Sequence, residues 1–317
     1  MNTAYLILAH NQPNQLERLL SRLNQPGVYF YIHIDRKSKD LNALLALKTK
    51  FINATILSVN NVNWMGYYMV DSTLRLMQLA VDSQISFKYI VLMSGQDYPI
   101  RSNTYINDFY TKHNTDFIYF DNVSLMPANF GIKVNYYHYM DVEAINPRNP
   151  KRNKLLTYLY FGLHKRFRQY FPKRKFYKGM QPFFGSQWFA LRLDTIKYIL
   201  EYVKQNPGYV SYMKNTEGPD ELFFQTIILN SERRTNVYGY NNYLEYLKTR
   251  KPTDQFSPGY SSLRYMDWGA HLKSKPAVLD LSYYDTLKTE DYLYARKVDE
   301  KTSAQLLDKI DATLLDL

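Results

Sequence analysis

Short apolar runs alternate with amphipathic stretches over the first 120 residues of the chain. We expect buried parallel strands at four apolar runs bounded by polar residues, at 5–9, 28–34, 55–57 and 89–93. Between them, apolar residues recur at helical spacing over 16–23, 41–47 and 70–80. A further strand candidate covers 116–120. The alternation predicts an α/β fold with a mostly parallel central sheet flanked by helices.

The second half of the chain continues this pattern less regularly. Residues 187–191 predict a strand, and Asp194 is placed to cap a helix through about residue 203. Pro219 suits the first position of a helix over 220–230, and residues 303–315 predict an amphipathic closing helix. We expect one domain over 1–317, with a nucleotide-binding half (1–125), an acceptor-binding and catalytic half (126–300) and a C-terminal helix (301–317).

Polar side chains follow three of the predicted strands. His10 follows the first strand, Asp35 the second, and Asp97 lies on a loop after the strand over 89–93. Because ligands of α/β proteins bind at the carboxyl ends of parallel strands, these positions predict a mononucleotide pocket. The chain has no G-x-G-x-x-G after its first strand and no G-x-x-x-x-G-K-[ST] loop, which argues against a dinucleotide site and a P-loop.

Composition is that of a globular protein, with 45% hydrophobic and 22% charged residues among 317. No cysteine is present, which excludes disulfides, thiolate catalysis and cysteine zinc sites. The start lacks a basic leader with a cleavage site, and no window holds 18 uninterrupted apolar residues, so we expect a cytoplasmic protein. Its 31 tyrosines suit contacts with sugar rings, although a biased composition explains them equally well.

Basic residues concentrate in the middle of the chain. The whole protein has a net charge of +11, yet residues 144–193 contain no Asp or Glu and carry twelve Lys or Arg, interleaved with aromatic residues. A solvated face is the simplest explanation of a charge run. The same composition also suits contact with anionic lipid, so we expect peripheral contact with the inner membrane face through 148–178.

Candidate carboxylates gather at 216–224, where Asp220 and Glu221 fall in the first turn of a predicted helix. Acidic residues there also complement the helix dipole, so their spacing alone leaves both a structural and a catalytic role open. Metal ligands are few, because the six His are scattered and no H-E-x-x-H occurs. Manganese-dependent sugar-nucleotide transferases carry Asp-x-Asp after a central strand, whereas here a single Asp97 stands. We therefore expect no metal and no cofactor, with basic side chains neutralising a leaving phosphate.

Seven short motifs occur in one order along the chain. They are Tyr-Leu-Ile-Leu-Ala-His at 5–10, His-Ile-Asp-Arg-Lys at 33–37, Leu-Met-Ser-Gly-Gln-Asp-Tyr-Pro-Ile at 92–100, Gly-Ser-Gln-Trp-Phe at 185–189, Pro-Asp-Glu at 219–221, Leu-Arg-Tyr-Met-Asp-Trp at 263–268 and Ala-Arg-Lys at 295–297. Together they resemble the core-2/I-branching N-acetylglucosaminyltransferase and peptide O-xylosyltransferase family (glycosyltransferase family 14), in a bacterial-type member. Each motif alone is weak, but seven in order cover nearly the whole chain.

The resemblance implies a GT-A-type fold and an inverting, metal-independent transfer from a UDP-sugar. GlcNAc and xylose are the donor sugars that the resemblance favours, while glucose and galactose stay open. We expect a glycan or a lipid-linked oligosaccharide as the acceptor, and the linkage is open. By position, Glu221 resembles the catalytic base, and Arg264 with Lys297 the pair that holds the donor diphosphate.

The remaining implied site residues surround the sugar nucleotide. His10, Asp35 and Asp97 fall where the family forms its nucleotide-sugar pocket, and Trp188 where acceptor and donor sugars meet. The family's Trp-Gly-Gly-type turn is Trp64-Met65-Gly66 here, so the shape of the pocket near this turn is open. The cysteines and membrane-anchored stem of animal members are also missing, so their disulfides and Golgi placement do not transfer.

Two other functions fit parts of the sequence. The basic, aromatic middle segment would suit a nucleic-acid-binding protein, but it follows no recognised nucleic-acid motif, so we expect no such partner. Salt-dependent retention on immobilised DNA would reveal one. A non-catalytic glycan-binding protein would suit the tyrosine content, but it leaves Glu221, Arg264 and Lys297 unexplained.

Overall fold

A six-stranded sheet forms the centre of the protein in a computed structural model, which describes residues 1–147, 149, 151–167, 170–251, 261–269 and 276–315. The strand order is β3-β2-β1-β4-β9-β6. Strands β1 to β4 are parallel, β9 is antiparallel to β4, and β6 is antiparallel to β9. The strands are β1 (Thr3–Ala9), β2 (Val28–Ile34), β3 (Ala54–Leu57), β4 (Tyr89–Ser94), β6 (Phe117–Ile118) and β9 (Phe189–Arg192). The predicted α/β fold with a mostly parallel sheet is confirmed.

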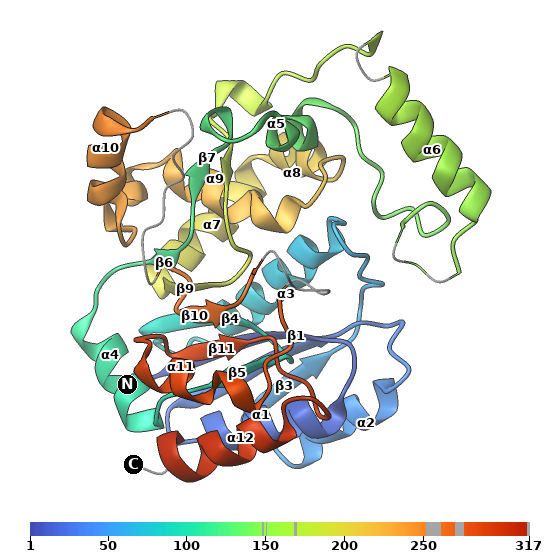
Figure 1. The fold of residues 1–317 in the computed structure, drawn as a ribbon. Coiled ribbons are helices and arrows are strands. Elements are labelled where there is room, and N and C mark those ends of the chain that lie inside the picture. Colours follow the sequence, from blue (N-terminus) through green and yellow to red (C-terminus); the bar gives the residue numbers. More distant parts are fainter. Residues whose placement is uncertain (148, 150, 168–169, 252–260, 270–275, 316–317) are drawn as a thin grey trace.

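Helices cover both faces of this sheet and bury two hydrophobic cores (Figure 1). Successive side chains of a strand point to opposite faces, so Tyr5 and Ile7 enter one core while Ala4 and Leu6 enter the other. The first core is closed by α1 (Pro13–Leu23), α2 (Leu41–Ala46), α4 (Asn103–Lys112), α11 (Tyr284–Thr289) and α12 (Ala304–Ile310). The second is closed by α3 (Tyr68–Asp82), α5 (Ala128–Asn135), α7 (Leu193–Gln205), α8 (Pro207–Met213), α9 (Phe223–Leu229) and α10 (Tyr240–Thr249).

Several tyrosines have a structural role in these cores. The largest fully buried side chains include Tyr5, Tyr89, Tyr98, Tyr110, Tyr209 and Tyr294. The hydroxyl of Tyr294 lies 3.2 Å from the hydroxyls of both Tyr5 and Tyr110, so these buried polar atoms satisfy one another. Part of the tyrosine content is therefore needed for packing and not for sugar contacts.

A second, three-stranded sheet in the order β10-β11-β5 was not expected from the sequence. Its strands are β5 (Asp97–Pro99), β10 (Arg264–Met266) and β11 (Tyr294–Arg296). Asp97 pairs with Arg296 across the antiparallel β5–β11 ladder, and β10 runs parallel to β11. The placement of Asp97 on a loop is thus wrong. Strands of three residues leave no periodic pattern to detect, and β5 pairs with β11 across more than 190 residues of the chain. Two further short strands, β7 (Asp121–Asn122) and β8 (Phe183–Phe184), pair with each other.

Two predicted helix starts are also wrong. Arg192, not Asp194, is the N-cap of α7, and Asp194 accepts a hydrogen bond from Arg233 at 2.7 Å. The predicted helix over 220–230 is a 3₁₀ turn, Pro219–Glu221, followed by α9. The predicted helix is interrupted after Glu221, because the carbonyl of Glu221 accepts a hydrogen bond from the N–H of Gly185 at 2.8 Å and not from a residue of the helix. The predicted closing helix over 303–315 is confirmed in part, because α12 spans Ala304–Ile310 and a π-helix follows over Asp311–Leu315.

Helix α6 (Lys154–Phe167) lies apart from the two cores and projects at the upper right of Figure 1. It belongs to the basic middle segment. Among the described residues, no helix is both long enough and apolar enough to cross a bilayer.

Candidate functional site

The carboxyl ends of β1, β2 and β4 bring His10, Asp35 and Asp97 to one edge of the central sheet. The backbone N–H of Asp35 donates to the carbonyl of Ala9 at 3.0 Å, which holds the two strand ends together. Burial lowers the pKa of His10, and Lys297 and Arg296 lower it further, whereas Asp35 opposes them. These residues come from distant parts of the chain, and this electrostatic coupling places them in one cluster.

Asp97 is the centre of a buried ion cluster. Its side chain is inaccessible to solvent, and its Oδ2 accepts from Arg264 Nε at 2.9 Å and from the Ser94 N–H at 3.1 Å. Its Oδ1 accepts from Arg296 Nη1 at 2.9 Å. Both carboxylate oxygens are therefore held by cations, as a buried charge requires.

Arg264 lies behind this cluster. Its side chain is 1% exposed, and its remaining nitrogens donate to the carbonyls of Ser262 and Leu92. Each nitrogen of the guanidinium thus has a protein acceptor. Arg264 fixes the orientation of Asp97, and its charge reaches the site from the interior.

Arg296 presents the more accessible cation of the cluster, with 15% of its side chain exposed. Its guanidinium lies 4.4 Å from the ring centroid of Trp188, within the range of a cation–π contact. Lys297, the next residue, is half-buried. Trp188 and Arg296 therefore form a cationic and aromatic wall, and the charge of Lys297, like that of Arg296, acts on His10. Arg296 entered the sequence interpretation only through the Ala-Arg-Lys motif, and the β5–β11 pairing reveals its contact with Asp97.

Glu221 lies in the Pro219–Glu221 turn beside Lys133, a residue that the sequence analysis did not single out. Lys133 Nζ is 3.5 Å from Glu221 Oε2, and the Glu221 side chain is 32% exposed. Burial raises the pKa of Glu221, and the charge of Lys133 opposes this rise. The Lys133 ammonium also faces the rings of Phe184 and Phe130 at 5.3 and 5.9 Å. Lys133 on α5 could not be found from a local pattern, because its contact with Glu221 is entirely tertiary.

Two more acidic groups flank Glu221. Asp220 is buried, and its Oδ1 has no hydrogen-bond partner within the described part of the chain. Glu217 lies with its Oε2 3.4 Å from Nδ1 of His138. Burial lowers the pKa of His138, so the imidazole is the favoured form near neutral pH. Of the three carboxylates, Glu221 combines access to solvent with a cation at its side chain.

The segment 185–188 connects Glu221 to the cationic wall. Gly185 donates its N–H to the carbonyl of Glu221 at 2.8 Å, and Gln225 Nε2 donates to the carbonyl of Ser186 at 2.7 Å. A Cβ at Gly185 would lie 1.8 Å from the carbonyl oxygen of Tyr119, so only glycine fits there. Three residues later, Trp188 contacts Arg296. This short segment therefore fixes the backbone of Glu221 relative to the cations.

The turn at 64–66 lies against the same region. Met65 has a positive φ of 65°, and its carbonyl accepts from the N–H of Gly218 at 3.1 Å. A Cβ at Gly218 would lie 2.8 Å from the Met65 sulfur. Met65 stands where the family resemblance has glycine. Its thioether therefore occupies space next to Gly218, three residues before Glu221.

A cavity of about 260 Å³ lies near Asp35. Its wall includes Arg36, Asn60 and Asn63, and the adjacent Val62 N–H donates to Asp35 Oδ1 at 3.2 Å. The imidazole of His33, whose pKa is lowered by burial to about 4, accepts from the N–H of Asn60. Polar, hydrogen-bonded walls of this kind suit a hydrophilic ligand.

Replacement of Asp220 by Asn is expected to stabilise the protein at alkaline pH. Burial, with the nearby charge of Glu221, raises the pKa of Asp220 from 3.8 to about 7. Folding thus favours the protonated form of Asp220. The stability of the wild type is therefore undiminished by this group below about pH 4, and it decreases as the pH rises through about 7 and the buried carboxyl ionises. The difference between the two pKa values sets an upper bound of about 4 kcal/mol on the increase in the free energy of unfolding that Asp220→Asn brings at pH 8.

Urea unfolding of Asp220→Asn and the wild type at pH 4 and pH 8 measures this difference. The exposed Asp285→Asn is the matched control and should change stability by less than about 0.5 kcal/mol at either pH. An Asp220→Asn protein that is less stable than the wild type at pH 8 would show that the buried carboxylate is compensated by contacts.

The fold and the site define an α/β protein with a polar pocket and a cation cluster at the carboxyl ends of its parallel strands. A sequence model described as "Branch: Core-2/I-Branching enzyme" matches residues 3–288, and the chain belongs to this family. The GT-A-type fold implied by the family resemblance agrees with the mixed, mostly parallel sheet observed.

Curated relatives include glycosyltransferases. Human N-acetyllactosaminide beta-1,6-N-acetylglucosaminyl-transferase is 25% identical over 235 residues, which cover 71% of this chain and 52% of that protein. Xylosyltransferase oxt of Drosophila pseudoobscura pseudoobscura is 24% identical over 233 residues, covering 72% of this chain and 24% of that protein. The chain spans about half the length of the first relative and a quarter of the second. Among solved structures, galactosyltransferase LgtC with donor and acceptor sugar analogues aligns with a TM-score of 0.39 and 11% identity over 98% of this chain and 96% of that one.

Proposed function

We propose that this chain is an inverting glycosyltransferase that moves GlcNAc or xylose from a UDP-sugar to a hydroxyl of a glycan acceptor. The observation that carries the proposal is the match to the core-2/I-branching family over residues 3–288. It is supported by the position of Glu221, which the segment 185–188 ties to the wall formed by Trp188 and Arg296.

Glu221 is the proposed general base. An inverting transfer is a single displacement, so one carboxylate that takes the proton of the acceptor hydroxyl is sufficient. Burial makes Glu221 a stronger base by raising its pKa, while the charge of Lys133 opposes this rise and favours the carboxylate form. Lys133 is therefore a positioning residue that acts through Glu221.

The cation cluster is proposed to hold the donor diphosphate. Charge develops on the β-phosphate as the sugar leaves, and fixed cations stabilise that charge more than the ground state. Lys297 and Arg296 offer accessible charge, and Arg264 adds its charge from the interior. His10 and Asp35 are proposed to contact the nucleotide-sugar donor. Trp188 is proposed to mark the junction of donor and acceptor sugars.

Asp97 is proposed to position arginines and not to bind a metal. Both of its carboxylate oxygens are engaged by Arg264 and Arg296, so a cation would have to displace an ion pair to reach them. In the part of the chain that the structure describes, no group of three or more His, Asp or Glu could hold a metal ion. The protein cations would then take the place of a metal at the leaving diphosphate.

Transfer is accordingly expected to continue in excess EDTA. The purified protein is incubated with a panel of UDP-sugars, and UDP release is measured with and without a glycan acceptor, in EDTA and in Mn²⁺. Release with UDP-GlcNAc or UDP-xylose at similar rates in both buffers supports the proposal. Turnover that EDTA abolishes and Mn²⁺ restores would refute metal independence. Failure of every UDP-sugar in the panel to release UDP would refute the proposed donor class.

A further inference from the structure

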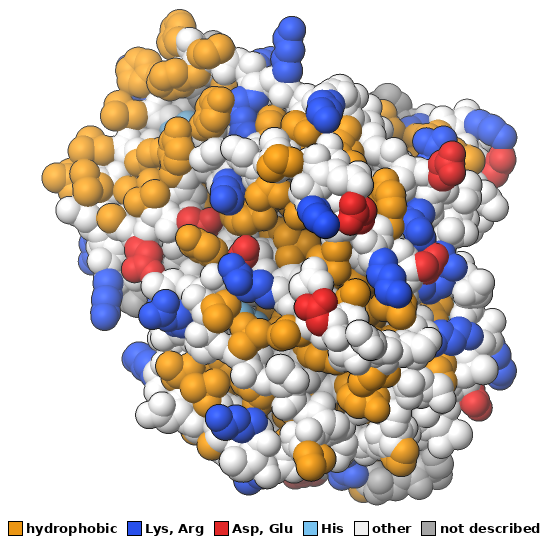
Figure 2. Space-filling model, turned by 180° about the vertical axis from the view of Figure 1, so that it is seen from behind, with side chains coloured by type: hydrophobic (Ala, Val, Ile, Leu, Met, Phe, Trp, Pro, Cys, Tyr) orange, Lys and Arg blue, Asp and Glu red, His pale blue; other side chains and the backbone are white. Residues whose placement is uncertain are grey.

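Helix α6 turns an apolar stripe toward solvent. Leu155, Leu159, Leu163 and Phe167 follow one another at four-residue spacing, and their side chains are 65%, 42%, 53% and 41% exposed. Residues this far apart lie on one face of a helix. Tyr158 is 76% exposed beside them. Figure 2 shows hydrophobic side chains gathered at the upper left of the molecule, in the region of α6. A soluble protein rarely exposes a continuous apolar surface of this kind without a partner.

The opposite side of α6 contacts the protein body. The ring of His164 lies 5.0 Å from that of His138 and 6.0 Å from that of Tyr136, and Tyr160 stacks on His164. The Tyr160 hydroxyl accepts a hydrogen bond from the N–H of Tyr139 at 3.3 Å. These contacts fix which side of the helix faces the protein body, so the stripe faces solvent although α6 is packed through Tyr160 and His164.

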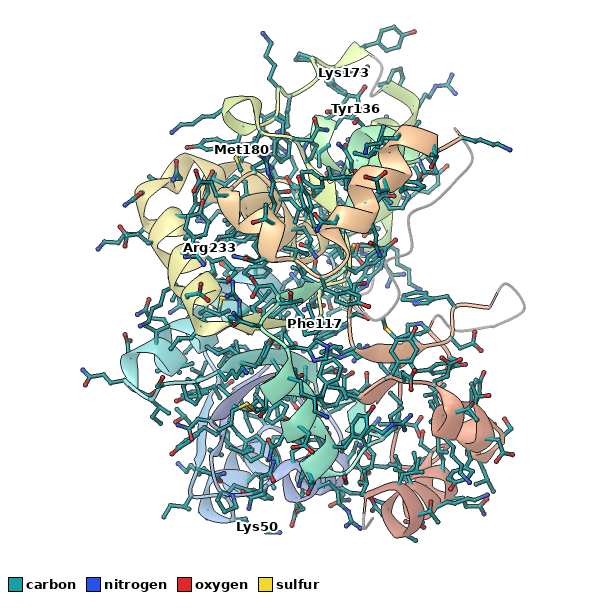
Figure 3. All side chains as sticks on the ribbon, turned by 90° about the vertical axis from the view of Figure 1, so that its left-hand side faces the viewer. Lys50, Phe117, Tyr136, Lys173, Met180 and Arg233 are labelled. Carbon is teal, nitrogen blue, oxygen red and sulfur yellow. The ribbon has the colours of Figure 1, made fainter. Side chains whose placement is uncertain are left out.

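The segment 144–193, which includes α6, carries basic side chains and no acidic ones. Its exposed cations are Lys151, Lys154, Arg166, Lys173, Lys175 and Lys178, and of these Lys178 donates a hydrogen bond to Asn206. Figure 3 places Lys173 at the opposite end of the molecule from Lys50. Arg148 and Arg168 lie outside the described residues, as does the side chain of Lys165.

Arg174 is an exception among these cations. Its guanidinium donates to the carbonyls of Tyr136, Tyr212 and Asn215 and lies between the rings of Tyr137 and Tyr212, at 4.5 and 3.7 Å. It is therefore a structural residue that anchors the segment, and it is not part of the exposed charge.

We infer that α6 and the exposed cations around it form a docking surface for an anionic lipid membrane. The apolar stripe would enter the interface between headgroups and acyl chains, while the Lys and Arg side chains remain at the level of the phosphates. At 14 residues, the helix is too short to span a bilayer and suits a position parallel to its surface. The absence of acidic residues gives the charge complementarity that a lipid surface rich in anionic headgroups requires.

This surface adjoins the candidate active site. Tyr160 and His164 on the inner side of α6 contact the segment that carries His138, and His138 is 3.4 Å from Glu217. Glu217 is four residues from Glu221. If the proposed transfer is correct, docking through α6 would hold the site close to an acceptor that is anchored in the same membrane. The docking itself is independent of that function and is tested without it.

Flotation with lipid vesicles tests the inference. The wild-type chain should float with vesicles of phosphatidylcholine mixed with phosphatidylglycerol, and bind at least about tenfold less to phosphatidylcholine alone. At about 1 M salt, where the screening length is about 3 Å, most of the binding should be lost.

Two variants separate the apolar and the charged contributions. The combined variant Leu155→Ser, Leu159→Ser, Leu163→Ser removes three of the four stripe residues. The combined variant Lys151→Gln, Lys154→Gln, Arg166→Gln, Lys173→Gln, Lys175→Gln removes five of the six exposed charges. Each should reduce binding by about tenfold or more, since one Lys or Arg near such a surface contributes about fivefold. Circular dichroism and thermal unfolding are used to check that both variants remain folded.

Matched controls carry equal changes elsewhere on the surface. Ile52→Ser, Leu247→Ser, Leu281→Ser is the apolar control, and Lys48→Gln, Lys112→Gln, Lys197→Gln, Lys204→Gln, Lys301→Gln is the charge control, all at exposed positions. Both should bind vesicles as the wild type does. Three results would overturn the inference: a wild type that ignores anionic vesicles, an α6 variant that binds normally, or light scattering that shows a dimer which only the stripe variant dissociates.

Discussion

Glu221→Gln is expected to lower kcat by roughly 10²–10⁴, which is the usual contribution of a positioned general base. Glutamine keeps the size of the side chain but cannot accept the proton of the acceptor hydroxyl. UDP binding should be unchanged, because the cation cluster and not Glu221 is proposed to hold the diphosphate. Steady-state transfer with the best donor of the UDP-sugar panel measures the loss, and calorimetric titration with UDP measures binding.

Glu217→Gln is the matched control for this variant. Glu217 is three residues before Asp220 in the same acidic segment, but it is paired with His138 and not with Lys133. Its replacement should cost much less than that of Glu221. A Glu221→Gln enzyme with nearly wild-type turnover would remove Glu221 from the mechanism, whereas equal losses in both variants would point to a general effect on the segment.

The pH dependence of transfer gives a second readout of the same role. Because burial raises the pKa of Glu221, the acidic limb of the kcat/KM profile should lie above the usual range of a glutamate. Activity should fall as the pH is lowered through this raised pKa, since protonation abolishes the base. In Glu221→Gln this limb should disappear from the residual rate.

Arg264→Ala is expected to reduce the free energy of unfolding by about 3 kcal/mol, near the lower end of the cost of removing one partner of a buried ion pair, because Asp97 keeps its contact with Arg296. Arg264 and Asp97 are 1% and 0% exposed and lie 2.9 Å apart, so water cannot compensate for the lost contact. Urea unfolding measures the loss. The double variant Arg264→Ala, Asp97→Asn should recover part of it, because the buried carboxylate that lost its Arg264 partner is replaced by a neutral amide.

Arg296→Ala and Lys297→Ala should behave differently. Asp97 keeps Arg264 as a partner in both, so the fold is expected to survive. Each variant should weaken the binding of UDP far more than that of uridine, because only UDP presents a diphosphate to these cations. Equal losses for UDP and uridine would assign the two residues to the fold. An Arg264→Ala protein as stable as the wild type, with a selective loss of UDP binding, would show that Arg264 binds the diphosphate directly.

The amino-acid sequence by itself determined the central sheet and most of the helices around it. Strands β1 to β4 and helices α1 to α3 are visible as alternating apolar runs and helical repeats, because each pattern reflects burial on a defined face of its own element. The order of seven short motifs also identified the family, since motif residues are local in the chain. His10, Asp35 and Asp97 could also be grouped from the sequence, because each follows a predicted parallel strand and parallel strands end at one edge of a sheet.

Only the tertiary structure decided how the site residues meet. The β5–β11 ladder places Arg296 opposite Asp97, and the fold places Arg264 inside and Lys133 beside Glu221. The hydrogen bond from Gly185 turns the predicted first turn of a helix into a separate 3₁₀ turn that carries Glu221. The outward apolar stripe of α6 also could not be read from its residues, because the same spacing normally predicts a buried face. Local pattern reports whether a residue is apolar and how often it recurs, whereas partners far along the chain decide what it touches.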